Sequence, residues 1–272
     1  MQLRRIFSIA FLSVIVTGCV SVQTTQPGAI GLDRKQRMSP LVSEQELRQG
    51  SAAAYAQVIG QARQKGSLNT NAALTRRVRL VADRLIPQSA VFRQDAVNWD
   101  WQVNVINSPE LNAWAMPGGK IAFYSGIIEK LKLSDAEIAA IMGHEISHAL
   151  REHSRERMSE QTNKGLLLEL LGAATGAGQS AKALADLAYQ ATVGLPNSRL
   201  HETESDRMGI ELMARAGYDP RAAVSVWQKM AKLSQGGGPE FLSTHPSHAT
   251  RIQDLTSYAQ RVMPLYQRAS NS

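Results

Sequence analysis

The sequence predicts an α+β fold: a mainly helical domain with a small antiparallel sheet beside one central helix. Three observations point to this class. Hydrophobic residues make up 43% of the 272 residues, enough for a sizeable core, while aromatic residues reach only 6%, a composition that favours helices over a β-sandwich. Apolar positions recur mostly at helical spacing. The alternation typical of strands is confined to one short stretch, residues 99–124.

Two helices are expected ahead of that stretch. Residues 43–66 are predicted to form the first, because Ser43 is a good N-cap residue with Glu46 three positions further on. Apolar side chains at helical spacing predict the second helix over Asn71–Leu85, and Pro87 then prevents it from continuing.

The strand-like stretch predicts a sheet of three or four strands. Residues 99–105 alternate apolar and polar side chains, which is the period of a half-buried strand. Asn112–Met116 and Lys120–Tyr124 are predicted as two further strands, joined by a tight turn at Pro117–Gly119. If Asn112–Met116 lies at the edge of the sheet, its backbone would be able to pair with an extended peptide.

A long helix is predicted to follow, beginning at Ser134, which forms a capping box with Glu137. Two apolar helical stretches come next, residues 166–171 and 181–193, and would form either a buried hairpin or a mobile lid. Both are too short to span a bilayer. Three more helices are expected over His201–Ala216, Arg221–Leu233 and Ala249–Gln267.

The first residues resemble the export signal of a bacterial lipoprotein. Arg4 and Arg5 precede an apolar run, residues 6–16, that is too short to span a bilayer as a stable helix. The run leads into Val16-Thr17-Gly18-Cys19, which resembles the lipobox, in which the Cys is lipidated and starts the mature chain. The alternatives are an ordinary signal peptide with an incidental Cys, or a weak membrane anchor.

The expected organisation is a signal peptide (1–18), a lipidated N-terminus with a polar tether (19–40) and one domain (41–272). Cys19 is the only Cys, so no disulfide forms within the chain. Val at position 20, where Asp would retain a lipoprotein at the inner membrane, resembles the sorting signal for the outer membrane. The net charge of +7 is scattered, which favours a solvated basic surface over nucleic-acid binding.

The motif His144-Glu145-Ile146-Ser147-His148 is an HExxH sequence within the long helix. Positions i and i+4 lie on one face of a helix, so both imidazoles reach one metal ion. Zinc held by three protein groups keeps a fourth position open and lowers the pKa of a bound water to about 7. Glu145 would take a proton from that water as general base and pass it to a leaving amine. The motif therefore predicts a zinc hydrolase with one ion per chain.

A third ligand must come from elsewhere in the chain. The metzincin pattern is excluded, because Arg151 and Ser154 stand where that pattern needs Gly and His. The remaining candidates are His153, His201, Glu202, Glu204 and His245.

Helical geometry indicates which of these candidates can reach the metal ion. His153 lies about 140° round the helix from His148, so it is poorly placed. Glu202 and Asp206 are at i and i+4 and share a face, so one of them can bind the metal while the other orients a ligand. Glu204 points about 200° away from that face and is expected to meet solvent.

The order of the motifs resembles that of one metallopeptidase family. After the HExxH helix come Leu195-Pro196-Asn197-Ser198-Arg199, Glu202-x-x-x-Asp206, Gly217-Tyr218-Asp219-Pro220, and Ser243-Thr244-His245-Pro246 with Arg251 downstream. Asn112–Gly119 is similar to the strand and turn beside that family's catalytic helix. The chain thus resembles the gluzincin family of the HtpX heat-shock protease and the CAAX prenyl protease. Among its members, the soluble periplasmic ones such as the β-barrel assembly-enhancing protease are most similar, without their repeat domain.

The resemblance implies a zincin-like metallopeptidase fold and a role for each matching position. Glu202 would be the third zinc ligand, and Asp206 would support the ligands from behind. His245 matches a His that approaches the metal, where it would either stabilise the oxyanion or occupy the open zinc position in a resting state.

The expected function is zinc-dependent endopeptidase cleavage of misfolded or unfolded cell-envelope proteins, by a chain held to the outer membrane through lipid on Cys19 and facing the periplasm. The substrates follow from the resemblance alone. Two alternatives stay open. One is an envelope chaperone or assembly factor whose protease site is normally closed by His245. The other is a binding protein with a structural zinc ion, which would need four permanent protein ligands.

Overall fold

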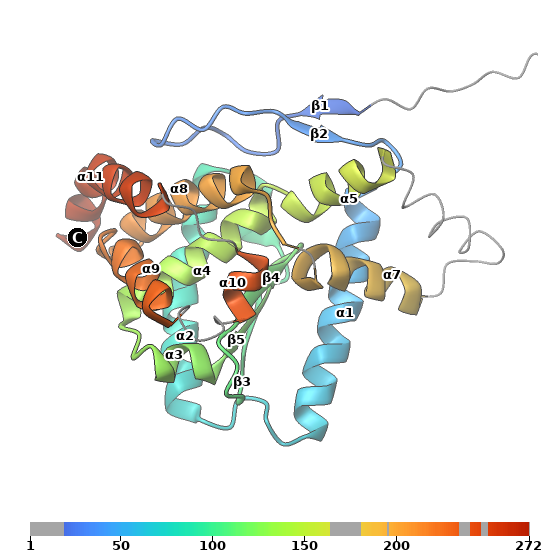
Figure 1. Ribbon diagram of the computed structural model, residues 1–272, viewed down its shortest axis with the longest axis horizontal. Coiled ribbons are helices and arrows are strands. Elements are labelled where there is room, and N and C mark those ends of the chain that lie inside the picture. Colours follow the sequence, from blue (N-terminus) through green and yellow to red (C-terminus); the bar gives the residue numbers. More distant parts are fainter. Residues whose placement is uncertain (1–18, 164–180, 195, 234–239, 246–249, 272) are drawn as a thin grey trace, which may run out of the picture.

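The computed structural model describes residues 19–163, 181–194, 196–233, 240–245 and 250–271 (Figure 1). The helices are α1 (Glu44–Gln64), α2 (Ala72–Leu85), α3 (Ser125–Lys130), α4 (Asp135–Leu150), α5 (His153–Asn163), α7 (Ala181–Tyr189), α8 (Arg199–Arg215), α9 (Ala222–Leu233), α10 (Glu240–Thr244) and α11 (Arg251–Ser270). Short 3-10 or π turns are η1 (Ile86–Val91), η2 (Gln94–Asn98) and η3 (Gln190–Gly194). The strands are β1 (Val20–Val22), β2 (Gln36–Met38), β3 (Gln102–Ile106), β4 (Ala113–Met116) and β5 (Lys120–Tyr124). The expected α+β class is confirmed.

The central sheet has three strands in the order β3-β5-β4 and is mixed, not antiparallel as expected. β4 and β5 form the expected antiparallel hairpin, whose turn places Gly118 and Gly119 at φ values of 82° and 84°. β3 instead pairs parallel to β5. The chain reverses between β3 and β4 and again between β4 and β5, so β3 and β5 run the same way. β4 lies at an edge of the sheet, which is the condition for its backbone to pair with an extended peptide.

Helix α4 carries the HExxH motif through the middle of the molecule (Figure 1). It packs against β4, α8 and α9, and every residue from Glu137 to Leu150 is buried. The predicted capping box starts it: the Ser134 N–H donates to the Glu137 carboxylate at 2.8 Å. Because α4 has no solvent face, the polar side chains of the motif are held inside the protein, where they must find partners.

Two glycines let α4 and α8 approach backbone to backbone. A Cβ added at Gly209 of α8 would lie 2.7 Å from the His144 backbone nitrogen, and one added at Gly143 of α4 would lie 2.9 Å from the Gly209 carbonyl oxygen. No larger residue fits at either position without moving a helix. The close crossing brings Glu202, two turns before Gly209, up to the two imidazoles of α4.

Residues 20–38 form a hairpin of β1 and β2, which we call the N-terminal hairpin; it lies across the top of the view in Figure 1. Composition indicated a flexible tether here, and that interpretation is wrong for these residues. Ile30 and Met38 are buried, and the backbone N–H groups of Ala29 and Ile30 donate to the buried Glu211 carboxylate at 3.0 and 2.9 Å. The residues of this hairpin have the polar composition of a linker, but charged residues distant in sequence, such as Glu211, hold them in a fixed structure.

The other elements follow the sequence prediction with local differences. The strand expected over 99–105 begins only at Gln102, which is the residue that pairs with Lys120 at the start of β5. The stretch 181–193 is helical, as α7 and η3, whereas the expected helix at 166–171 and the signal peptide at 1–18 lie outside the described residues. Among the helices that the structure describes, none is both long and apolar enough to cross a membrane.

Candidate metal centre

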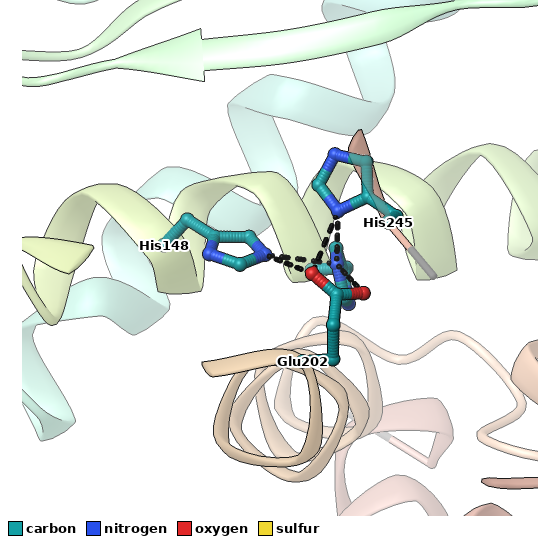
Figure 2. A group of neighbouring side chains, drawn as sticks. His148, Glu202 and His245 are labelled. Carbon is teal, nitrogen blue, oxygen red and sulfur yellow. Dashed lines mark hydrogen bonds and ion pairs between the residues drawn. The ribbon is translucent and has the colours of Figure 1, made fainter. Parts of the chain in front are cut away.

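Four buried side chains converge on one point. His144 and His148 come from α4, Glu202 from α8, and His245 directly follows α10. Their ligand atoms all lie within 4.8 Å of one another. His144 Nε2 is 3.0 Å from His148 Nε2 and 3.1 Å from His245 Nδ1. Glu202 Oε1 is 3.3 Å from His148 Nε2 and 3.0 Å from His245 Nδ1, so its carboxylate faces both rings (Figure 2).

Asp206 decides which nitrogen of His144 faces this point. His144 Nδ1 lies 2.8 Å from Asp206 Oδ1, and because a carboxylate only accepts, Nδ1–H donates to it. In the neutral ring, Nε2 then presents its lone pair to the convergence point. Asp206 is itself held by Arg251, whose Nη2 donates to Asp206 Oδ1 at 2.7 Å and whose Nη1 lies 2.8 Å from Glu202 Oε2. One buried guanidinium thus fixes both carboxylates.

His148 is oriented by a second relay that the sequence did not reveal. His153 Nε2 lies 3.1 Å from Glu204 Oε2 and donates to it, which leaves His153 Nδ1 as an acceptor. His148 Nδ1 lies 2.8 Å from that nitrogen, so His148 donates through Nδ1 and turns the lone pair of Nε2 to the convergence point. Glu204 was expected to meet solvent and is instead 1% exposed. His153 lies outside the four converging residues, but it orients one of them, His148.

The fifth candidate, His201, is also buried but faces away from the convergence point. Its Nε2 lies 3.1 Å from Glu156 Oε2, and its ring stacks on His153 with 4.2 Å between ring centroids. The candidates therefore separate into direct neighbours of the point, Glu202 and His245, and residues that lie behind His148, namely His153, Glu204 and His201.

The arrangement fits a metal ion. Ligand atoms about 2.1 Å from a tetrahedral zinc ion are about 3.4 Å apart, and the separations between neighbouring donor atoms here are 3.0–3.4 Å. Imidazole and carboxylate are also ligands that zinc takes. The four residues therefore form a possible metal site.

Glu145 lies beside this point on the side of His245. The Glu145 side chain is 3% exposed, and its Oε1 is 3.4 Å from His245 Nε2. Burial raises the pKa of Glu145, while the charges of His245 and His144 and the backbone N–H of Ala115 in β4 act to lower it. A buried carboxyl with a raised pKa is suited to accept and return a proton near neutral pH.

The buried charges set the protonation of the other groups. Burial alone would raise the pKa of Glu202, but His245, His144 and Arg251 hold it well below its ordinary value. Burial would lower the pKa of His144, yet Glu202 and Asp206 outweigh it and raise that pKa to about 9. Burial lowers the pKa of His148 well below its ordinary value. Before any cation enters, the site thus holds an ionised Glu202, a protonated His144 and a neutral His148.

Residues 72–259, which include α4, α8 and all four converging residues, match the family model described as Peptidase family M48. The chain belongs to this family. Family membership confirms the motif-based resemblance and the predicted class of enzyme, a metallopeptidase.

Several curated relatives are similar to this M48 chain over part of their length. The mitochondrial metalloendopeptidase OMA1 of Arabidopsis thaliana is 37% identical over 158 residues, covering 57% of this chain and 31% of that protein. The OMA1 protein of Saccharomyces cerevisiae is 32% identical over 180 residues, 63% of this chain and 51% of the relative. The beta-barrel assembly-enhancing protease of Escherichia coli is 26% identical over 221 residues, 78% of this chain and 44% of the relative. This chain thus spans about half or less of the relatives that it matches.

Proposed function

We propose that this M48 chain is a zinc-dependent endopeptidase that cleaves misfolded or unfolded proteins of the bacterial cell envelope. The observation that carries the proposal is the meeting of His144, His148 and Glu202 around one point, with the buried Glu145 beside it. Two imidazoles and a carboxylate are the ligand set of catalytic zinc in peptidases, and a neighbouring carboxyl is the proton carrier that peptide hydrolysis needs.

Each residue then has a defined part in hydrolysis. A zinc ion bound there would supply a Lewis acid for the scissile carbonyl and for water. Glu145 accepts a proton as the water attacks and returns it to the departing amine, so no proton is lost in the cycle. Asp206 and His153 hold the two imidazoles in the tautomer that leaves Nε2 free for the ion.

Strand β4 supports a preference for unfolded substrates. It lies at the edge of the sheet and directly beside Glu145 through Ala115. An extended segment added to this edge would be aligned by backbone hydrogen bonds along the active-site helix, and unfolded chains offer such segments.

His245 supports a second candidate, a chaperone or assembly factor whose protease site is normally closed. Its Nδ1 is 3.1 Å from His144 Nε2 and 3.0 Å from Glu202 Oε1, where it would complete a four-ligand set. Zinc with four protein ligands has no position for water or substrate. In this resting form the chain would bind clients without cutting them until His245 leaves.

For location, we propose lipid on Cys19, the outer membrane and the periplasmic side. The support is the sequence Val16-Thr17-Gly18-Cys19 behind a basic and apolar leader, together with Val at position 20. Radiolabelled palmitate that is incorporated into the wild-type chain but not into Cys19→Ser would support it. Label that persists in Cys19→Ser would refute it.

The test of the activity is casein degradation by the purified full chain with and without a chelator, followed by zinc addition. We expect cleavage to stop on chelation and to return with zinc. Glu145→Gln should bind zinc as wild type does yet lose at least about a hundredfold in rate, because the proton carrier is gone. Glu46→Gln, an exposed Glu-to-Gln change on α1, is the matched control and should cleave normally. Full activity in Glu145→Gln would sink the proposal.

His245→Ala separates the two candidate functions. If His245 closes the site, its removal opens a position for water and casein cleavage rises, which would favour the second candidate. If His245 instead stabilises the transition state, cleavage falls while zinc binding persists.

A further inference from the structure

We propose that Arg34 of the N-terminal hairpin is a positioning residue of the metal centre, which keeps His148 turned towards the ion. The inference deepens the proposed zinc endopeptidase function and rests on it. Arg34 lies between β1 and β2, far in sequence from both metal-binding helices, and no motif marks it.

The guanidinium of Arg34 binds two buried carboxylates, those of Glu156 and Glu204. Its Nη1 and Nη2 donate to the two oxygens of Glu156 at 2.7 and 2.8 Å, while Nε and Nη2 donate to Glu204, the latter at 3.0 Å. The Glu156 and Glu204 side chains are only 3% and 1% exposed. Only the planar fork of an Arg can hold two carboxylates in this way, since a Lys ammonium is a single point of charge.

Both carboxylates act on the relay behind His148. Glu204 accepts from His153 Nε2 at 3.1 Å, and His153 accepts from His148 Nδ1 at 2.8 Å. Glu156 lies 3.1 Å from His201 Nε2, and the His201 ring stacks on His153. Arg34 thus fixes the edge of the His153 ring through Glu204 and its face through Glu156 and His201. A ring held on edge and face cannot rotate away from His148.

A second cation, Arg151, ties the same carboxylate to the hairpin. Arg151 lies 2.9 Å from Glu204 through Nη2, and it donates to the Arg34 carbonyl at 3.0 Å and to Thr25 Oγ1 at 2.9 Å. Two guanidinium groups and two carboxylates leave the buried cluster without net charge. Without Arg34, Arg151 still holds Glu204 Oε2 through Nε and Nη2, but two buried carboxylates then share one guanidinium, and Glu156 loses the two bonds that hold it against His201.

The experiment is zinc binding by the purified full chain, measured by competition with a chromogenic chelator at neutral pH, alongside urea unfolding of the metal-free protein. Arg34→Ala is expected to weaken zinc affinity about tenfold, the low end for outer partners of a metal ligand, because Arg34 acts through two intervening side chains. Arg34→Lys should also bind zinc more weakly, since it keeps the charge but loses the fork. Arg37→Ala removes an exposed positive charge from the same hairpin and should leave affinity unchanged.

The outcomes separate the two levels of inference. If Arg34→Ala binds zinc as wild type does, or loses stability with no loss of affinity, Arg34 only holds the hairpin and the proposal fails. An equal loss in Arg37→Ala would also defeat it, since it would show a general effect of charge. Should Arg34→Ala not fold, Arg34→Lys decides by the same criterion. A wild-type chain that binds no zinc defeats the proposed function itself.

Discussion

Replacing Gly209 by Ala tests whether the close crossing of α4 and α8 builds the metal centre. The added Cβ would lie 2.7 Å from the His144 backbone nitrogen and 2.9 Å from the Gly143 carbonyl carbon, whereas ordinary contact begins at 3.4 Å. Backbone atoms cannot rotate aside as side chains do, so the helices must part by the difference between 3.4 and 2.7 Å, about 0.7 Å. Glu202 on α8 then moves away from His144.

Two effects of known size follow from that displacement. Overpacking costs about 1–3 kcal/mol, and the helix preference of Ala over Gly returns about 1 kcal/mol, so the free energy of unfolding should fall by up to about 2 kcal/mol. The movement also exceeds the tolerance of about 0.2 Å on metal–ligand distances. We therefore expect zinc affinity to fall at least about tenfold, the size of change seen when ligand positioning is disturbed.

Urea unfolding of the metal-free chain and chelator competition measure the two effects separately. Gly60→Ala is the matched control, because Gly60 lies inside α1 and an added Cβ there meets no atom within 4 Å. That control should gain about 0.5–1 kcal/mol with unchanged zinc affinity. If Gly209→Ala is as stable as Gly60→Ala and binds zinc as tightly as wild type, the helix crossing does not set the ligand geometry, and the reasoning is refuted.

Two further predictions concern pH. The pKa of His144 is raised to about 9 in the metal-free site, so zinc must displace the proton of this ring when it binds. Zinc affinity should therefore rise with pH up to about 9 and then level off. Calorimetry in two buffers of different ionisation enthalpy measures the released proton. For Glu156, burial raises the pKa but Arg34 and His201 outweigh it and lower it to about 2. Its folded pKa lies below the unfolded one, so its contribution to stability is present above about pH 4.5 and is lost as pH falls towards 2. Glu156→Gln should therefore be less stable than wild type in urea at pH 7, and this difference should shrink as pH falls from about 4.5 to about 2; a difference independent of pH would contradict this.

The centre of the site could be predicted because its residues obey local geometry. His144 and His148 share a face of α4 by their spacing, and Glu202 and Asp206 share a face of α8 in the same way. The prediction that Glu204 meets solvent was wrong because α8 is buried on more than one face: Glu204 is buried as well as Glu202 and Asp206. The face that carries Glu204 meets α5 and the N-terminal hairpin.

The remaining differences come from partners that no local pattern encodes. Alternation identifies β3 as a strand but carries no information on the direction of its neighbour, so the parallel pairing with β5 could not be read from it. The N-terminal hairpin has the polar composition of a linker, and charged residues far along the chain, among them Arg151, Glu204 and Glu211, give its polar groups a fixed place.

The ordered hairpin has a mechanical consequence if Cys19 carries acyl chains. β1 begins at Val20, one residue after that Cys, and β2 is already docked on the domain by Met38. A flexible linker of about 20 residues would let the domain wander some 25 Å, about the width of a small protein. The described chain has no such linker between Cys19 and the domain, so the active site would be held at a fixed distance from the lipid headgroups. Its reach would then be limited to polypeptides that come to the membrane surface themselves.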